Sequence, residues 1–172
     1  ALQGAIIHDY LPFLSKVMMA DGMLDSPLRA VLRKGKSHYV CDARLMKRLQ
    51  TANLDRKNPL AKAALLSMRD HLDLDMAPHL SGYDRERICV PPTCDCGKTE
   101  CRYLCYLDVC ASERYAIQVC NHNLLLADAI HQGSGKRPIM PDSCAIVMDE
   151  AHKLPETARQ MFGITLAAGE LH

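Results

Sequence analysis

The chain has 172 residues, 48% of them hydrophobic, and a formal net charge of +1 at pH 7. This length is enough for one domain that buries most of its apolar surface, and the near-neutral total charge gives no indication of a partner. No run approaches the roughly 18 apolar residues that span a membrane, and Ala1–Ile7 lacks the charged leader of a secretory signal.

Helices are predicted wherever apolar residues recur at a spacing of three or four. Leu2–Met19 shows this spacing, with an interruption expected at Pro12. A later helix is announced by Asn58 as its cap and Pro59 as its first residue. The helices expected after the first cover residues 43–52, 60–72, 102–113, 124–130 and 155–161, and residues 79–92 are expected to be irregular because they contain Ser-Gly and Pro-Pro breakers.

Positive charge is concentrated in the first half of the chain. Between Arg29 and Arg69 there are eleven Lys or Arg residues and two Asp residues. Such a block is typical of a protein that binds a phosphate backbone, and on charge alone a solvated helix face explains it equally well.

Nine cysteines are present, and six of them fall between residues 89 and 110. An odd number without a secretory signal favours a reduced compartment over a disulfide framework. Only the pair Cys101 and Cys105 has the spacing of a zinc knuckle, whereas iron–sulfur clusters accept irregular spacing and a distant fourth ligand. Cys41 follows the basic stretch that begins at Lys34, and positive neighbours favour its thiolate. Cys120 and Cys144 read as small buried apolar residues.

Two short apolar runs predict parallel strands at Ala116–Cys120 and Ala145–Met148. Open α/β sheets bind ligands beyond the carboxyl ends of such strands. There Asp149 could hold Mg²⁺ on a nucleotide phosphate, Glu150 could orient or deprotonate the attacking water, and His152 would face the γ-phosphate. The alternative is an acidic first turn of a helix that opens at Asp149.

Neither of two Gly-Lys segments qualifies as a phosphate-binding loop. Gly97–Thr99 and Gly133–Lys136 have part of the pattern, but Pro92 and Ile130 stand where its first glycine is required. The chain therefore contains no credible loop of this kind.

Four segments, taken in order, resemble the iron–sulfur DNA helicases of superfamily 2, of the DinG and XPD type. They are Ala1–Gln3, Lys34–Cys41, Asn121–Asp128 and Met148–His152, the last resembling a DEAH box. The cysteine block lies between the second and third segments, where the family places its cluster domain.

The resemblance implies an α/β fragment. Parts of a RecA-like parallel sheet would carry an inserted, mostly helical iron–sulfur cluster domain. Residues 1–33 and 116–172 would belong to the first motor domain, and residues 34–115 would form the insertion.

The resemblance also implies an activity. The whole protein would use ATP and Mg²⁺ to move along single-stranded DNA, usually 5′ to 3′, and unwind duplexes in repair or replication. We expect a bacterial, cytoplasmic, nucleoid-associated protein with no membrane partner. The family's phosphate-binding loop would precede Ala1 and its second motor domain would follow His172, so we expect the 172 residues alone not to hydrolyse ATP and to need the remainder of a helicase chain.

Site residues follow from the same resemblance. Asp149 would bind Mg²⁺, Glu150 would be the catalytic base and His152 a coupling residue. A 4Fe-4S cluster would be held by the thiolates of Cys41, Cys94, Cys96 and Cys101. Cys105 and Cys89 are the substitutes for the last three.

The nucleic-acid contacts are expected in the basic block. Lys34, Lys36 and Arg44 would meet phosphates, while Tyr39 and Tyr103 could stack on bases. Burial of the two tyrosines against neighbouring helices is an equally good interpretation.

Two other classes of protein remain open. A zinc-stabilised nucleic-acid-binding module would use the same cysteines structurally and would have no motor activity. A metal-dependent nuclease could use Asp149, Glu150 and His152, but such enzymes gather acids from several elements and no second acidic site stands out.

Overall fold

The structure is a computed structural model that describes residues 2–54, 57–94, 101–136 and 138–163. The chain divides into two compact units, one formed by residues 1–33 and 116–172 and the other by residues 34–115. That these units are part of a motor domain and a cluster insertion stays a prediction. The chain is mostly helical with a small parallel sheet, as expected of an α/β chain. None of the described helices is long and apolar enough to cross a membrane.

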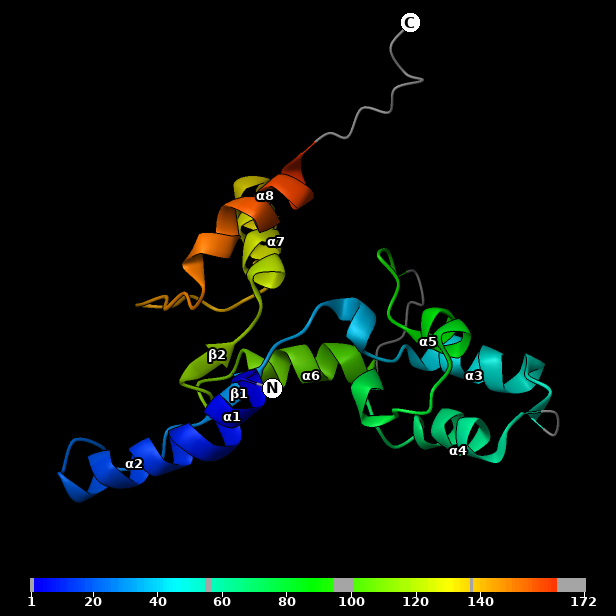
Figure 1. Cartoon of the computed structure of the whole chain (residues 1–172), viewed down its shortest axis with the longest axis horizontal. Coiled ribbons are helices and arrows are strands. Elements are labelled where there is room, and N and C mark those ends of the chain that lie inside the picture. Colours follow the sequence, from blue (N-terminus) through cyan, green and yellow to red (C-terminus); the bar gives the residue numbers. More distant parts are fainter. Residues whose placement is uncertain (1, 55–56, 95–100, 137, 164–172) are drawn as a thin grey trace, which may run out of the picture. The chain divides into compact units, whose positions relative to one another are not determined.

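The first unit is built around two short parallel strands (Figure 1). Strand β1 (Ala30–Leu32) pairs with β2 (Ile117–Val119), and the whole second unit lies in the chain between them. The prediction of a strand at 116–120 is confirmed. The sequence does not predict β1, because three residues are too few to show a period.

Helices complete the first unit. The helix predicted at the start forms as α1 (Leu2–Ala5), a π-helical turn (Ile6–Tyr10) and α2 (Leu11–Ala20), with Pro12 accommodated in the first turn of α2. Helices α7 (His122–Gly133) and α8 (Leu154–Phe162) pack side by side (Figure 1).

A buried acid and a buried base fix the loop that follows α7. Asp128 is 5% exposed and accepts hydrogen bonds from the backbone N–H groups of Ile139 and Met140, at 2.6 and 3.1 Å. Arg33, 3% exposed, donates to the carbonyl oxygen of Ile139 at 2.8 Å and to the Gln118 side chain on β2 at 3.2 Å. The Ile139 residue is thus held through both its N–H and its carbonyl against the end of the sheet.

The predicted buried strand at 145–148 is wrong for this structure. These residues are not in a strand, and the side chains of Ile146 and Val147 are 58% and 95% exposed. A parallel strand needs a neighbour to satisfy its N–H and C=O groups. Within the described ranges the sheet contains only β1 and β2, so the apolar run has no neighbouring strand.

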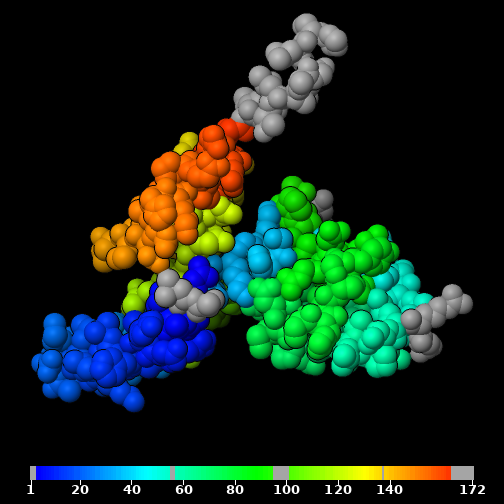
Figure 2. Space-filling view, in the orientation of Figure 1, coloured from blue at the N-terminus to red at the C-terminus, as the bar shows by residue number. Residues whose placement is uncertain are grey.

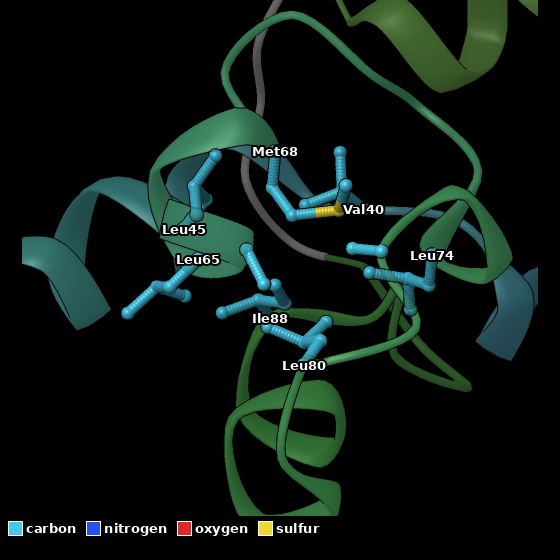
Figure 3. Packing of buried hydrophobic residues seen from close by; sticks show 9 residues of the cluster. Val40, Leu45, Leu65, Met68, Leu74, Leu80 and Ile88 are labelled. Atoms are coloured by element: carbon cyan, nitrogen blue, oxygen red, sulfur yellow. The ribbon is translucent and has the colours of Figure 1, made fainter. Parts of the chain in front are cut away.

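The described part of the second unit contains four α-helices, of which the first three pack around one core and the fourth packs against a smaller cluster of Tyr39, Cys41 and Val90. The four helices are α3 (Asp42–Thr51), α4 (Pro59–Ser67), α5 (Gly82–Ile88) and α6 (Arg102–Cys110). Figure 2 shows this unit as a closely packed body in cyan and green. Buried side chains from the first three helices and their connections converge in Figure 3, namely Val40, Leu45, Leu65, Met68, Leu74, Leu80 and Ile88.

An extended segment, residues 39–41, runs through the second unit and is paired on both sides. The N–H of Val40 donates to Leu72 and the N–H of Cys41 to Ile88, at 2.9 and 2.7 Å. Val90 donates back to Tyr39 at 2.8 Å. These bonds tie the start of α3 to the end of α5.

Helix caps explain where two of these helices begin. The Asn58 side chain accepts the N–H of Leu60 at 2.9 Å, which confirms the predicted start of α4, although α4 ends at Ser67 rather than near residue 72. The expectation that 79–92 is irregular is wrong, because α5 forms there. Ser81 caps it by accepting the N–H of Asp84 at 3.1 Å, a signal that Ser-x-x-Asp carries in the sequence.

The Asp84 carboxylate is fully buried and carries three strong contacts. It accepts from Arg48 Nε on α3, from Lys57 Nζ and from Ser81 Oγ, each at 2.7 Å. Burial alone would raise the pKa of Asp84, but the hydrogen bonds from Lys57, Ser81 and Arg48 outweigh it and lower that pKa. The charge therefore joins three parts of the second unit.

We predict that Asp84→Asn lowers the free energy of unfolding of this unit by about 3 kcal/mol, because it leaves Arg48 and Lys57 without their charge partner. Hydrogen exchange of the α5 amides in the full chain measures this loss. Asp108→Asn, at an exposed position of α6, should change it by less than about 1 kcal/mol. Equal effects of the two substitutions would contradict the prediction.

The depressed pKa fixes the sign of the pH dependence. The unfolded state binds the proton more readily, so the contribution of Asp84 is complete above its unfolded pKa of about 3.9 and is lost as pH falls toward its folded pKa. In Asp84→Asn the free energy of unfolding should therefore fall less steeply as pH is lowered through this range.

Candidate functional site

The acidic segment lies in the first unit on a sharp turn just before α8. The N–H of Glu150 donates to the Asp149 carboxylate at 3.0 Å, and Glu150 adopts left-handed backbone angles, φ 51° and ψ 38°. His152 and Lys153 lie in the following 3-10 turn, and each places a side-chain nitrogen 3.2 Å from Glu150 Oε2. The structure thus gathers the three predicted catalytic residues in one exposed turn.

The geometry of Glu150 is a strained one. A left-handed backbone at a residue other than glycine costs on the order of 1 kcal/mol or more. The ion pairs of Glu150 are exposed, with half of its side chain in water, and such pairs return between 0 and about 1 kcal/mol. The side-chain contacts of Glu150 therefore do not repay the strain of its backbone. Strained backbone conformations cluster at active sites and ligand-binding segments. The helix that follows has Lys153 as its N-cap, so Asp149 does not cap a helix as the alternative interpretation required.

A second histidine meets this turn. His122 Nε2 lies 2.9 Å from the backbone oxygen of Asp149, so the bond requires the tautomer with a proton on Nε2. His122 is the first residue of α7, and Asn121 caps that helix by accepting the N–H of Leu124 at 2.9 Å. Sequence reasoning gave His122 no role. Its signal is the Asn-His-Asn tripeptide directly after β2.

Two of the four predicted cluster ligands stand at equivalent places in the second unit. Cys41 is the N-cap residue of α3 and Cys101 that of α6, with backbone angles of −98°, 116° and −102°, 116°. The residues that follow them are in direct contact, because Arg102 Nε donates to the Asp42 carboxylate at 2.8 Å. Arg102 also donates to the carbonyl oxygen of Arg69 at 2.9 Å. This clasp brings the starts of α3 and α6 together.

Of the other two predicted ligands, the structure describes one. Cys94 is exposed, and Cys96 lies outside the described residues. Among the residues that the structure describes, no three His, Cys, Asp or Glu side chains are grouped so that they could hold a metal ion. The donor chemistry of the set suits an iron–sulfur cluster, but the described part of the site does not assemble it.

Of the substitute ligands, Cys89 lies beside the residue that precedes Cys41. Val40 and Cys89 form an antiparallel bridge. The Cys89 thiol donates to the carbonyl oxygen of Glu86 at 3.4 Å and lies 3.7 Å from an Arg44 nitrogen. Cys105 is exposed.

The predicted phosphate-binding lysines have partners inside the protein. Lys34 Nζ pairs with Asp73 and Asp75 at 2.5 and 2.8 Å, and Lys36 Nζ donates to the carbonyl oxygen of Pro92. Burial alone would raise the pKa of Asp75, but the hydrogen bonds from Lys34 and Arg85 outweigh it and hold that pKa below its usual range. The structure gives both lysines roles in fixing loops of the second unit.

Tyr39 is buried, so its ring is not presented to a base. It is 3% exposed, with its ring centroid 5.3 Å from that of Tyr103 and 5.0 Å from that of Tyr106. Its hydroxyl lies 3.1 Å from the Tyr106 hydroxyl and accepts the N–H of Lys34 at 3.2 Å. Burial raises the pKa of both Tyr39 and Tyr106. Of the two interpretations of Tyr39, burial against a neighbouring helix is the one observed.

Two curated proteins that are similar to this chain belong to the same class. The chain resembles ATP-dependent DNA helicases along 99% of its length. It is 28% identical over 180 residues to the ATP-dependent DNA helicase YoaA of Escherichia coli strain K12, and 26% identical over 188 residues to the protein of that name from Haemophilus influenzae. The chain spans 27% of the length of each relative. The resemblance to helicases of the DinG and XPD type is thereby confirmed.

Other comparisons add nothing to this class. No family model matches the chain, and no solved structure matches it.

We predict that Tyr39→Ala lowers the free energy of unfolding of the second unit by about 3 to 5 kcal/mol, since it empties a buried aromatic site. Tyr39→Phe keeps the ring and removes only the hydroxyl contacts, so it should cost about 1 kcal/mol. Hydrogen exchange of the α3 amides would measure both. A negligible cost for Tyr39→Ala would show that the ring is on the surface.

Proposed function

We propose that this chain is part of an ATP-dependent DNA helicase that moves along single-stranded DNA and unwinds duplexes, in DNA repair or replication. In this proposal residues 1–33 and 116–172 belong to the first RecA-like motor domain. Residues 34–115 form an inserted iron–sulfur cluster domain. Single-stranded DNA and the remainder of the helicase chain are the partners.

The observation that carries this proposal is the similarity to two curated DNA helicases along 99% of the chain. The topology is compatible with it, because the second unit is inserted between two strands that pair in parallel. The strained turn at Glu150 adds independent support, since its position coincides with the segment Met148–His152 that resembles a DEAH box.

The acidic turn carries two carboxylates of the kind that nucleotide hydrolysis uses. Asp149 and Glu150 are exposed carboxylates, and oxygen ligands of this kind suit Mg²⁺. Bound Mg²⁺ and ATP would supply the phosphate chemistry. In this proposal Asp149 holds the ion, Glu150 accepts a proton from the attacking water, and His152 communicates with the rest of the motor. His122 holds the Asp149 backbone and so positions the carboxylate beside it.

The cysteines of the second unit would hold a 4Fe-4S cluster through Cys41, Cys94, Cys96 and Cys101. The Asp42–Arg102 clasp supports this choice, because it joins the helix starts that carry Cys41 and Cys101. A cluster would then cross-link two segments that are 60 residues apart in the chain. In the alternative function, a zinc-stabilised nucleic-acid-binding module without motor activity, zinc would do the same.

Anaerobic purification of the full chain distinguishes the two metals. We expect a brown protein with about four iron atoms per chain, and loss of both colour and iron in Cys41→Ser and Cys101→Ser. Cys144→Ser, at an exposed position in the first unit, is the matched control and should retain its iron. A colourless protein that contains zinc would support the alternative.

The motor assignment is tested in a longer protein that contains this chain. Glu150→Gln should lower DNA-stimulated ATP turnover about 10²- to 10⁴-fold, because it removes the proton acceptor, and should leave DNA binding intact. Glu156→Gln, an exposed acid on α8, provides the matched charge change and should leave turnover within about twofold. Unchanged turnover in Glu150→Gln would overturn the assignment.

A further inference from the structure

A basic pocket of 480 Å³ lies within the second unit, between α3 and α5. Its lining consists of four cations, one hydroxyl and one aromatic ring: Arg44, Lys47, Arg48, Thr51, Tyr83 and Arg87. Among the residues that the structure describes, no carboxylate belongs to this lining. Among the cations, sequence analysis singled out only Arg44.

Little of this positive charge is neutralised inside the protein. Arg48 donates to the buried Asp84 through Nε, at 2.7 Å. Arg44 donates to two backbone oxygens, those of Cys89 and Glu86, at 2.7 and 2.8 Å. A carbonyl oxygen orients a guanidinium and carries no formal charge to cancel it. In the described part of the chain Arg44, Lys47 and Arg87 have no carboxylate partner.

The Tyr83 ring also orients two of the arginines without neutralising their charge. The Arg87 guanidinium carbon lies 3.5 Å from the ring centroid and that of Arg48 lies 5.0 Å from it. Cation–π contacts hold a guanidinium without a counter-ion. The pocket therefore presents three guanidinium groups that are oriented before any ligand arrives.

The row on α3 is too long for a single small anion. Arg44, Lys47, Arg48 and Thr51 recur at the spacing of one helix face, and at 1.5 Å per residue they span about 10 Å. Guanidinium forks match phosphate oxygens in pairs. An extended chain of phosphates fits this row better than one phosphate or one carboxylate.

We propose that this α3–α5 pocket binds the phosphate backbone of single-stranded nucleic acid. The proposal rests on the proposed function, which supplies the strand. Binding follows charge and not base sequence, because the one aromatic ring of the pocket is engaged by arginines. The phosphate contacts are then made by this pocket and not by Lys34 and Lys36, which hold loops of the second unit.

The test measures binding of the full chain to a fluorescently labelled oligothymidylate by anisotropy, as a function of salt. Lys47→Gln is the informative variant, because Lys47 is exposed and its side chain makes no hydrogen bond or ion pair with the described residues. One lost phosphate contact should weaken binding about five- to tenfold at about 50 mM salt, and should reduce the slope of log affinity against log salt by about 0.7. Arg87→Gln should behave alike.

Lys16→Gln, on α2 of the first unit, provides the same charge change outside the pocket and should leave affinity within about twofold. Equal losses in Lys16→Gln and Lys47→Gln would overturn the pocket, since only total charge would then matter. Binding by wild type with no loss in either pocket variant would overturn the pocket and leave the helicase proposal standing. No binding by wild type at low salt would count against both.

Competitors identify the ligand. An excess of unlabelled oligothymidylate should displace the probe, whereas a DNA duplex or polyglutamate at equal charge should displace it at least about tenfold less well. Equal displacement by the duplex would overturn the single-strand assignment. Equal displacement by polyglutamate would show that the pocket takes an acidic polypeptide.

Discussion

The buried carboxylate of Asp84 is the interaction on which the second unit depends. A charge with no exposure to water is tolerated only when it is paired and hydrogen-bonded, and Asp84 is satisfied by two cations and a hydroxyl. Because Arg48 comes from α3 while Ser81 and Asp84 belong to α5 and its cap, the same contact holds these two helices in register. The basic pocket lies between them, so its cations are arranged by an acid that is not itself in the pocket.

Residues near Cys41 show a related division of tasks. The segment 39–41 is hydrogen-bonded on both sides, and the Tyr39 ring is packed among other tyrosines. Lys34 and Lys36 close neighbouring loops. Lys34, Lys36 and Tyr39 thus contribute to the structure of the second unit. The cations without a carboxylate partner among the described residues lie instead on α3 and α5.

Much of the secondary structure could be predicted from the sequence, because capping and period are local signals. Asn58 and Pro59 mark the start of α4, and the apolar run at Ile117–Val119 marks a strand. The run at 145–148 carries the same signal, but whether it becomes a strand depends on a neighbour that the signal does not contain. The Gly82–Ile88 helix was missed because the breakers around it outweighed the cap at Ser81. The cation pocket could not be predicted at all, since it depends on which charges Asp84 and the backbone neutralise.

The pairing of β1 with β2 has a consequence for how this chain folds. Leu32 and Val119 are partners in the sheet, and the N–H of Arg33 donates to Val119 at 2.7 Å. Because the strands are parallel, the chain leaves the sheet beside the end of β2 and re-enters it at the start of β2, beside Ala30. Closing a loop of that length in a disordered chain carries an entropic cost that grows with its length. A second unit that has already collapsed around its own core spans a shorter distance than a disordered chain of that length, which shortens the effective loop. We therefore expect the insertion to acquire its structure before the short sheet pairs.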